Sequence, residues 1–159
     1  MHAQENLDLK GTACVPVRTV EEDELAFHAG ERMDFVLHYR WGAINSDVGS
    51  ATVTLDNVTY DGQEAFLCHA HGRTSKFFDI FFKVREDFKS WFTRDGLRPL
   101  KFTRDTHEGG YEARNSFIYR WAEKTPYIDA DVYSSSSGQR NPDLPLTPCT
   151  FDIPSLFFY

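Results

Sequence analysis

Two histidines, His69 and His71, have a spacing that could support metal chemistry. They stand two residues apart in a predicted strand, so both side chains point to the same face of a sheet. Two imidazoles on one face can bind zinc or copper when a third ligand joins them, and His107 or Glu108 could supply it from a turn. The alternative is that both are polar side chains on a solvated face. We favour that interpretation and expect no metal cofactor.

Arginines stand beside carboxylates at Arg85-Glu86-Asp87, Arg94-Asp95 and Arg104-Asp105. Such groups could hold an anionic head group or transfer protons between carboxylates. Neighbouring residues of a strand face opposite ways, however, so pairing between strands is the favoured interpretation.

No catalytic signature is present in the sequence. There is no Gly-x-Ser-x-Gly, no Cys-x-x-Cys and no glycine-rich phosphate loop before a helix. The sequence therefore predicts no catalytic residue. A metal-dependent hydrolase that uses the histidines and nearby carboxylates stays open as an alternative.

The overall charge and apolar content exclude some partner classes. The 159 residues carry a formal net charge of −7, which disfavours nucleic acid and anionic membrane surfaces. No segment approaches the roughly 20 apolar residues that span a bilayer. Aromatic residues make up 15% of the chain, which favours β structure.

Alternation of apolar and polar residues between Met33 and Tyr133 predicts the fold. Turn signals at Asp61-Gly62, Asp95-Gly96 and Gly109-Gly110 separate the alternating runs. We therefore expect an all-β protein with a curved antiparallel meander sheet of about six to eight strands, forming a half-barrel or open barrel.

The composition divides the chain into three parts. Residues 1–25 are an irregular N-terminal lead, 26–133 the antiparallel sheet domain, and 134–159 a Ser/Pro-rich loop followed by the start of a helix. The apolar end Leu156–Tyr159 has no helix cap, so we expect a truncated C-terminal helix that continues in a longer protein.

The densest apolar run, Lys76–Val84, predicts a short helical turn near 76–83, with its phenylalanines three and four apart. The rings could line an apolar cavity or fill the core, and we expect Phe77, Phe81, Phe88 and Phe102 to be buried together. The residues predicted to bind a ligand combine five aromatic side chains with two arginines for an anionic head group: Phe77, Phe81, Phe82, Trp91, Phe102, Arg73 and Arg85.

Three cysteines stand far apart in the sequence. Cys68 alternates with apolar neighbours, which is typical of a buried small residue. Cys14 and Cys149 could form a disulfide in an oxidising compartment. The segment Met1–Glu5 resembles what remains after a secretory cleavage site.

Several segments in order resemble a bacterial envelope family catalogued only as domain of unknown function three-one-zero-eight. They are Phe27-His28-Ala29-Gly30-Glu31, Tyr39-Arg40-Trp41-Gly42, Val48-Gly49-Ser50-Ala51, Phe82-Lys83-Val84-Arg85-Glu86-Asp87, Leu97-Arg98-Pro99-Leu100 and Glu108-Gly109-Gly110-Tyr111. The resemblance covers nearly the whole chain and implies a secreted protein, periplasmic or outer-membrane associated. It carries no activity. At the level of the fold only, the chain is similar to half-barrel lipoprotein carriers, whose curved sheet wraps an apolar helix.

Together these features favour an envelope protein that binds an apolar small molecule or lipid on the concave face of its sheet. A structural or interaction protein with a self-filled core is the first alternative, and the metal-dependent hydrolase is the second.

Overall fold

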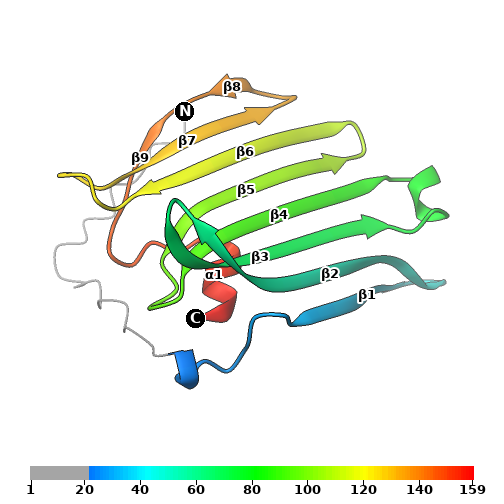
Figure 1. Ribbon diagram of the computed structural model, residues 1–159. Helices are drawn as coiled ribbons and strands as arrows, with labels where there is room; N and C mark the ends of the chain where they lie inside the picture. Colours follow the sequence, from blue (N-terminus) through cyan, green and yellow to red (C-terminus); the bar gives the residue numbers. More distant parts are fainter. Residues whose placement is uncertain (1–21) are drawn as a thin grey trace.

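A single antiparallel sheet dominates the computed structural model, which describes residues 22–159 (Figure 1). A short 3-10 helix precedes the sheet, a second one interrupts it, and a short α-helix follows it. The elements in order are η1 (Glu22–Glu24), β1 (Arg32–Trp41), β2 (Ile44–Tyr60), β3 (Gln63–Thr74), η2 (Phe78–Ile80), β4 (Val84–Thr93), β5 (Pro99–Glu108), β6 (Tyr111–Arg120), β7 (Tyr127–Ser134), β8 (Gly138–Arg140), β9 (Asp143–Pro145) and α1 (Ile153–Phe158).

The strands follow one another in a meander. From β1 to β8 each strand pairs antiparallel with the next, and β9 pairs with β7. The order runs from β1 to β8 without β1 pairing back to β8, so within the described residues the sheet is open. The predicted antiparallel meander is confirmed. The expected number of strands was too low, because the nine strands include the short β8 and β9 in the Ser/Pro-rich segment.

The predicted Asp-Gly turn between β2 and β3 has the conformation that a two-residue hairpin needs. Asp61 and Gly62 both have positive φ values, 50° and 80°. Two consecutive residues with positive φ match the right-handed twist of the flanking strands, and Asp-Gly is a favoured pair there. The local sequence therefore determines this hairpin.

The sheet has two chemically different faces. One cross-strand row from β2 to β7 is mostly apolar and consists of Leu55, Cys68, Ser90, Phe102, Phe117 and Ala130. The adjacent row is polar and consists of Thr54, His69, Lys89, Thr103, Ser116 and Asp131. Because successive side chains alternate, these rows belong to opposite faces. We call the first the helix face, since α1 packs on it, and the second the outer face.

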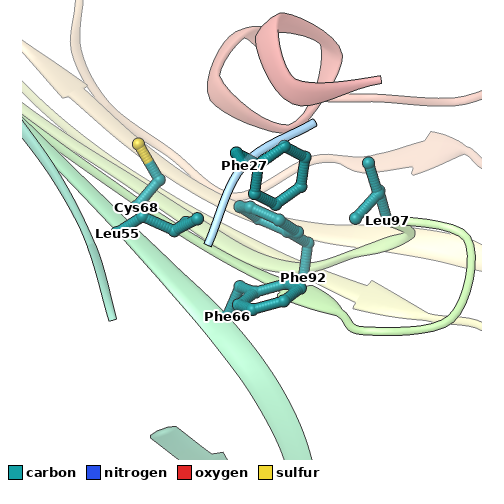
Figure 2. Packing of buried hydrophobic residues seen from close by; sticks show 6 residues of the cluster. All are labelled: Phe27, Leu55, Phe66, Cys68, Phe92 and Leu97. Atoms are coloured by element: carbon teal, nitrogen blue, oxygen red, sulfur yellow. The ribbon is translucent and has the colours of Figure 1, made fainter. Parts of the chain in front are cut away.

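Two apolar clusters cover the helix face. Figure 2 shows the first, in which Phe27, from the segment before β1, joins residues of the sheet and of the β4–β5 connection: Leu55, Phe66, Cys68, Phe92 and Leu97. The Phe27 and Phe66 rings meet edge to face with centroids 5.7 Å apart. The second cluster contains Phe102, Tyr119, Ile128 and Leu146. Segments before and after the sheet thus contribute to its core.

The helix α1 is fixed to the sheet by one buried carboxylate. Asp152 caps the helix, accepting a hydrogen bond from the Ser155 backbone N–H at 2.8 Å. Its other oxygen accepts a hydrogen bond from the Ser90 hydroxyl of β4 at 2.7 Å. Phe158, at the end of the helix, stacks on Phe92 at 5.9 Å between centroids. Both ends of α1 are therefore held against the helix face.

The predicted burial of four phenylalanines is wrong for two of them. Phe88 and Phe102 stack at 6.3 Å between centroids, but Phe77 and Phe81 are exposed. The predicted helical turn is present as η2. It lies in the β3–β4 connection at the end of the sheet opposite α1 (Figure 1), and among the described residues Phe77 and Phe81 remain exposed there. The helical spacing brings the Phe77 and Phe81 rings into contact with each other. It does not bury them, because burial needs a second surface that packs against the rings.

Two of the three cysteines lie within the residues that the structure describes. Cys68 is a buried free thiol, as expected. Cys149 is disulfide-bonded. Its predicted partner Cys14 and the cleavage-site segment Met1–Glu5 lie outside the described residues. Between residues 22 and 159, no helix has the length and apolar character to cross a membrane.

We predict that Asp152→Ala destabilises the protein by about 1–3 kcal/mol, because it removes the helix cap and leaves the Ser90 hydroxyl without its buried partner. Chemical denaturation measures the change. Asp152→Asn is the matched control, since an asparagine oxygen also caps a helix and its amide group can donate to Ser90. Equal destabilisation by both substitutions would contradict the capping role.

Candidate functional site

An apolar pocket of about 260 Å³ lies between the helix face and α1. Strands β1 to β4 form its floor and α1 forms one wall. Every lining residue is apolar: Phe35, Val53, Cys68, Ala70, Phe88, Ile153, Pro154 and Phe157. The pocket is therefore a place where an apolar group could leave water.

Short side chains in the middle of the sheet form the floor of the hollow. Cys68 and Ala70 lie two residues apart in β3, so they share the helix face. The bulky rings of Phe35 and Phe88 come from the strands on either side. Because the central side chains are short and the outer ones are long, α1 cannot fill the space between them.

The reactivity of the pocket lining depends on one thiol. Cys68 is the nucleophilic side chain in its lining. Burial, reinforced by the nearby Asp152 carboxyl, raises the pKa of this thiol to about 12. The thiol is therefore protonated at neutral pH and is a poor nucleophile. The volume is slightly below the roughly 300–1,000 Å³ of typical ligand pockets, which suits a small apolar group or part of a longer chain.

A polar cluster adjoins the pocket on the same face. The Arg104 guanidinium lies 5.8 Å from the ring centroid of Phe88, a pocket residue. Arg104 Nε donates to the Thr106 hydroxyl at 2.6 Å, and that hydroxyl donates to Glu86 at 2.6 Å. Glu108 lies 3.9 Å from Arg104. The helix face thus has an apolar part and a charged part in direct contact.

Burial raises the pKa of the Glu86 carboxyl above its ordinary value, and the neighbouring Glu108 adds to the effect. The hydrogen bond from Thr106 and the charge of Arg104 act in the opposite direction. A carboxyl held in this way takes up a proton more readily than an exposed one.

The structure divides the five predicted aromatic ligand residues among three places. Phe102 lies on the helix face but packs between Phe88 and Phe117 in the second cluster. The predicted Phe77, Phe81 and Phe82 lie in the exposed β3–β4 connection. Trp91 lies on the outer face, since it follows Ser90 in β4, and the Lys101 ammonium is 5.4 Å from its ring centroid.

The two predicted arginines also lie on the outer face. Arg73 pairs with Arg85 across β3 and β4. The Arg85 guanidinium binds the Asp79 carboxylate at 2.6 Å. Neither arginine lies beside the apolar pocket, so within the described residues Arg104 takes the position that the sequence assigned to them.

The histidines share the outer face, as their spacing predicted. The ring centroids of His69 and His71 are 5.7 Å apart, and His69 Nε2 lies 2.6 Å from an Asp87 oxygen. His107 instead approaches Asp105 at 3.4 Å and Glu112 at 3.6 Å. Across residues 22–159, no group of three or more His, Cys, Asp or Glu side chains is arranged to hold a metal ion.

The pocket residues Phe35, Val53 and Ala70 were missed as ligand candidates. Their alternation placed Phe35 and Val53 on the apolar side of their strands. The small residue at position 70 was the available signal for a hollow. The position of α1 decides which aromatic rings border the pocket. The alternation within the strands does not predict where α1 packs.

Comparison with protein families gives one match. The family model described as "Protein of unknown function (DUF3108)" matches residues 34–159, which include every residue that lines the pocket. No curated protein and no solved structure matches the chain.

We predict that Glu86→Gln stabilises the protein increasingly as the pH rises from the ordinary glutamate value of 4.5. A carboxyl whose pKa is raised on folding favours the folded state at low pH and loses that contribution as the pH passes its raised pKa. Glutamine can still accept the Thr106 hydrogen bond and does not ionise. Thermal unfolding across pH 4 to 8, roughly the span over which shifted carboxyls titrate, measures the difference. A constant difference over this range would contradict the predicted titration.

Proposed function

This chain belongs to the DUF3108 family of proteins of unknown function, and we propose that it binds an apolar, lipid-like ligand in the pocket between the helix face and α1. The single observation that carries the proposal is the exclusively apolar lining of that pocket. Burial of apolar surface drives such binding with about 25 cal/mol per Å².

The apolar surface continues beyond the pocket. Ile153 and Phe157 of α1 line the pocket and are also exposed, and so is Phe35. Leu37 and Tyr39 follow Phe35 on the same side of β1 and are exposed too. Contiguous apolar surface of this kind is typical of binding sites. A ligand longer than the pocket would extend along β1 from Phe35.

The polar cluster suggests an amphipathic ligand. Phe88 belongs to the pocket lining, and the Arg104 guanidinium lies over its ring. A polar group at the Phe88 end of the ligand would therefore meet Arg104 and Glu86, which the buried Thr106 hydroxyl holds in place. The apolar portion supplies the affinity and the polar cluster the orientation.

We also propose that the protein is secreted and acts in the periplasm or at the outer membrane. The disulfide at Cys149 supports this, because disulfides persist in oxidising compartments. A core that fills itself, with no ligand, is the competing interpretation of the same apolar face.

We predict that the protein binds a fluorescent long-chain fatty acid, and that Ala70→Phe weakens this binding about tenfold or more. The new ring would occupy the pocket where Ala70 now leaves space. Fluorescence titration measures the affinity, and calorimetry should show a negative heat-capacity change.

The matched control is Ala43→Phe, which adds the same ring in the exposed β1–β2 turn. It should bind as tightly as the unmodified protein. Absence of binding by the unmodified protein would favour the self-filled core. Equal binding by both variants would place the ligand outside this pocket and contradict the proposal. Thermal unfolding of Ala70→Phe separates loss of the pocket from loss of the fold.

A further inference from the structure

A second apolar surface lies at the end of the sheet opposite α1, in the β3–β4 connection (Figure 1). Four large side chains within six consecutive residues are exposed there: Phe77 by 64%, Ile80 by 78%, Phe81 by 72% and Phe82 by 56%. We call these four residues the aromatic tip. The fold does not bury them, although apolar groups of this size favour removal from water.

Hydrogen bonds hold the aromatic tip in a fixed shape. The Asp79 carboxylate accepts hydrogen bonds from Arg85 at 2.6 and 2.9 Å and from the Thr74 hydroxyl at 2.5 Å. The backbone N–H groups of Phe81 and Phe82 both donate to the Phe78 carbonyl. Asp79 therefore ties the 3-10 turn to the ends of β3 and β4.

The neighbouring β5–β6 turn supports the same arrangement. The Gly109 N–H donates to the Lys83 carbonyl at 2.8 Å. The Phe82 ring lies so close to Gly109 that a Cβ atom there would be only 2.7 Å from it. The β3–β4 and β5–β6 connections therefore hold each other in place. Because the backbone of the aromatic tip is already ordered, it loses little conformational entropy on binding.

Basic residues surround the aromatic tip. Lys76 and Lys83 flank it in the sequence and are both exposed. Arg73, at the end of β3, is exposed as well. Asp79 is the carboxylate within the tip, and its hydrogen bonds from Arg85 and Thr74 lower its pKa. Asp47 lines the same hollow as Arg73 and Lys76, and Glu108 lies opposite Val84, so carboxylates lie near these cations as well. Exposed apolar groups with lysines directly on both sides in the sequence match the interface of a bilayer with anionic head groups.

We propose that the aromatic tip inserts into the interfacial region of a lipid bilayer that contains anionic lipids, with Lys76, Lys83 and Arg73 at the level of the phosphates. The formal net charge of −7 opposes this approach. Charges farther away than the Debye length of about 8 Å at physiological salt are largely screened. Apolar insertion therefore supplies most of the affinity, and the local cations orient the molecule.

The shape of the aromatic tip favours a bilayer over a protein partner. It projects at the end of the sheet (Figure 1), and four side chains account for its apolar surface. A stable protein interface usually buries more than about 1,000 Å² in total with matched shapes. A projecting apolar tip needs no matched shape to enter lipid. This membrane contact is independent of the proposed ligand pocket, which shares no residue with the aromatic tip and lies over the middle of strands β2 to β4.

The test compares flotation of the protein with vesicles of phosphatidylethanolamine and phosphatidylglycerol. The double substitution Ile80→Ser/Phe81→Ser should reduce the bound fraction about tenfold or more, since burying one large apolar side chain is worth about a factor of ten. Val36→Ser/Leu144→Ser removes two other exposed apolar side chains and should leave flotation unchanged. Unfolding midpoints show that each variant stays folded.

A charge variant tests the orientation of the tip. Lys76→Glu/Lys83→Glu should weaken flotation several-fold on the phosphatidylglycerol vesicles and little on vesicles of phosphatidylcholine.

Three results would overturn the proposal. They are no flotation of the unmodified protein, flotation unaffected by Ile80→Ser/Phe81→Ser, and vesicle-free self-association that this double variant abolishes. The last result would show that the aromatic tip is a contact between copies of the chain.

Discussion

The buried hydrogen bond between Ser90 and Asp152 is the interaction on which the pocket depends. It joins the middle of β4 to the first turn of a helix 62 residues later in the chain. The same carboxylate caps that helix. A six-residue helix is too short to be stable alone, so the sheet must hold it in place. Without this bond, the first turn of the helix, where Ile153 lines the pocket, would lose its hydrogen bond to the sheet, and only the packing of Phe158 would hold α1.

The contrast between small and large residues then decides the shape of the helix face. Where long side chains meet, as at Phe92 and Phe158, α1 packs closely. Where Ala70 provides little bulk, the same helix leaves a hollow. The charged cluster around Arg104 borders that hollow, so one face combines two environments. This combination fits an amphipathic molecule better than a purely apolar one.

The abundant phenylalanines have three different roles in this fold. Phe66 and Phe92 form the core, and Phe35 and Phe88 border the pocket. The aromatic tip projects from the opposite end of the sheet and is exposed. The proposed ligand pocket over the middle of the sheet and the proposed membrane-inserting tip at its end would together let one protein contact a bilayer and carry a ligand at the same time.

The sequence by itself determined the strands, their meander order, the Asp61-Gly62 hairpin and the division into an apolar and a polar face. These depend on alternation and on backbone preferences within a few residues. The shared face of His69 and His71 followed for the same reason. Tertiary structure decided which aromatic residues are buried. Phe77 and Phe81 were expected in the core, but they lie beyond the ends of the strands, while α1, remote in the chain, covers Phe92. Burial depends on what packs above a residue, and a local pattern does not contain that information.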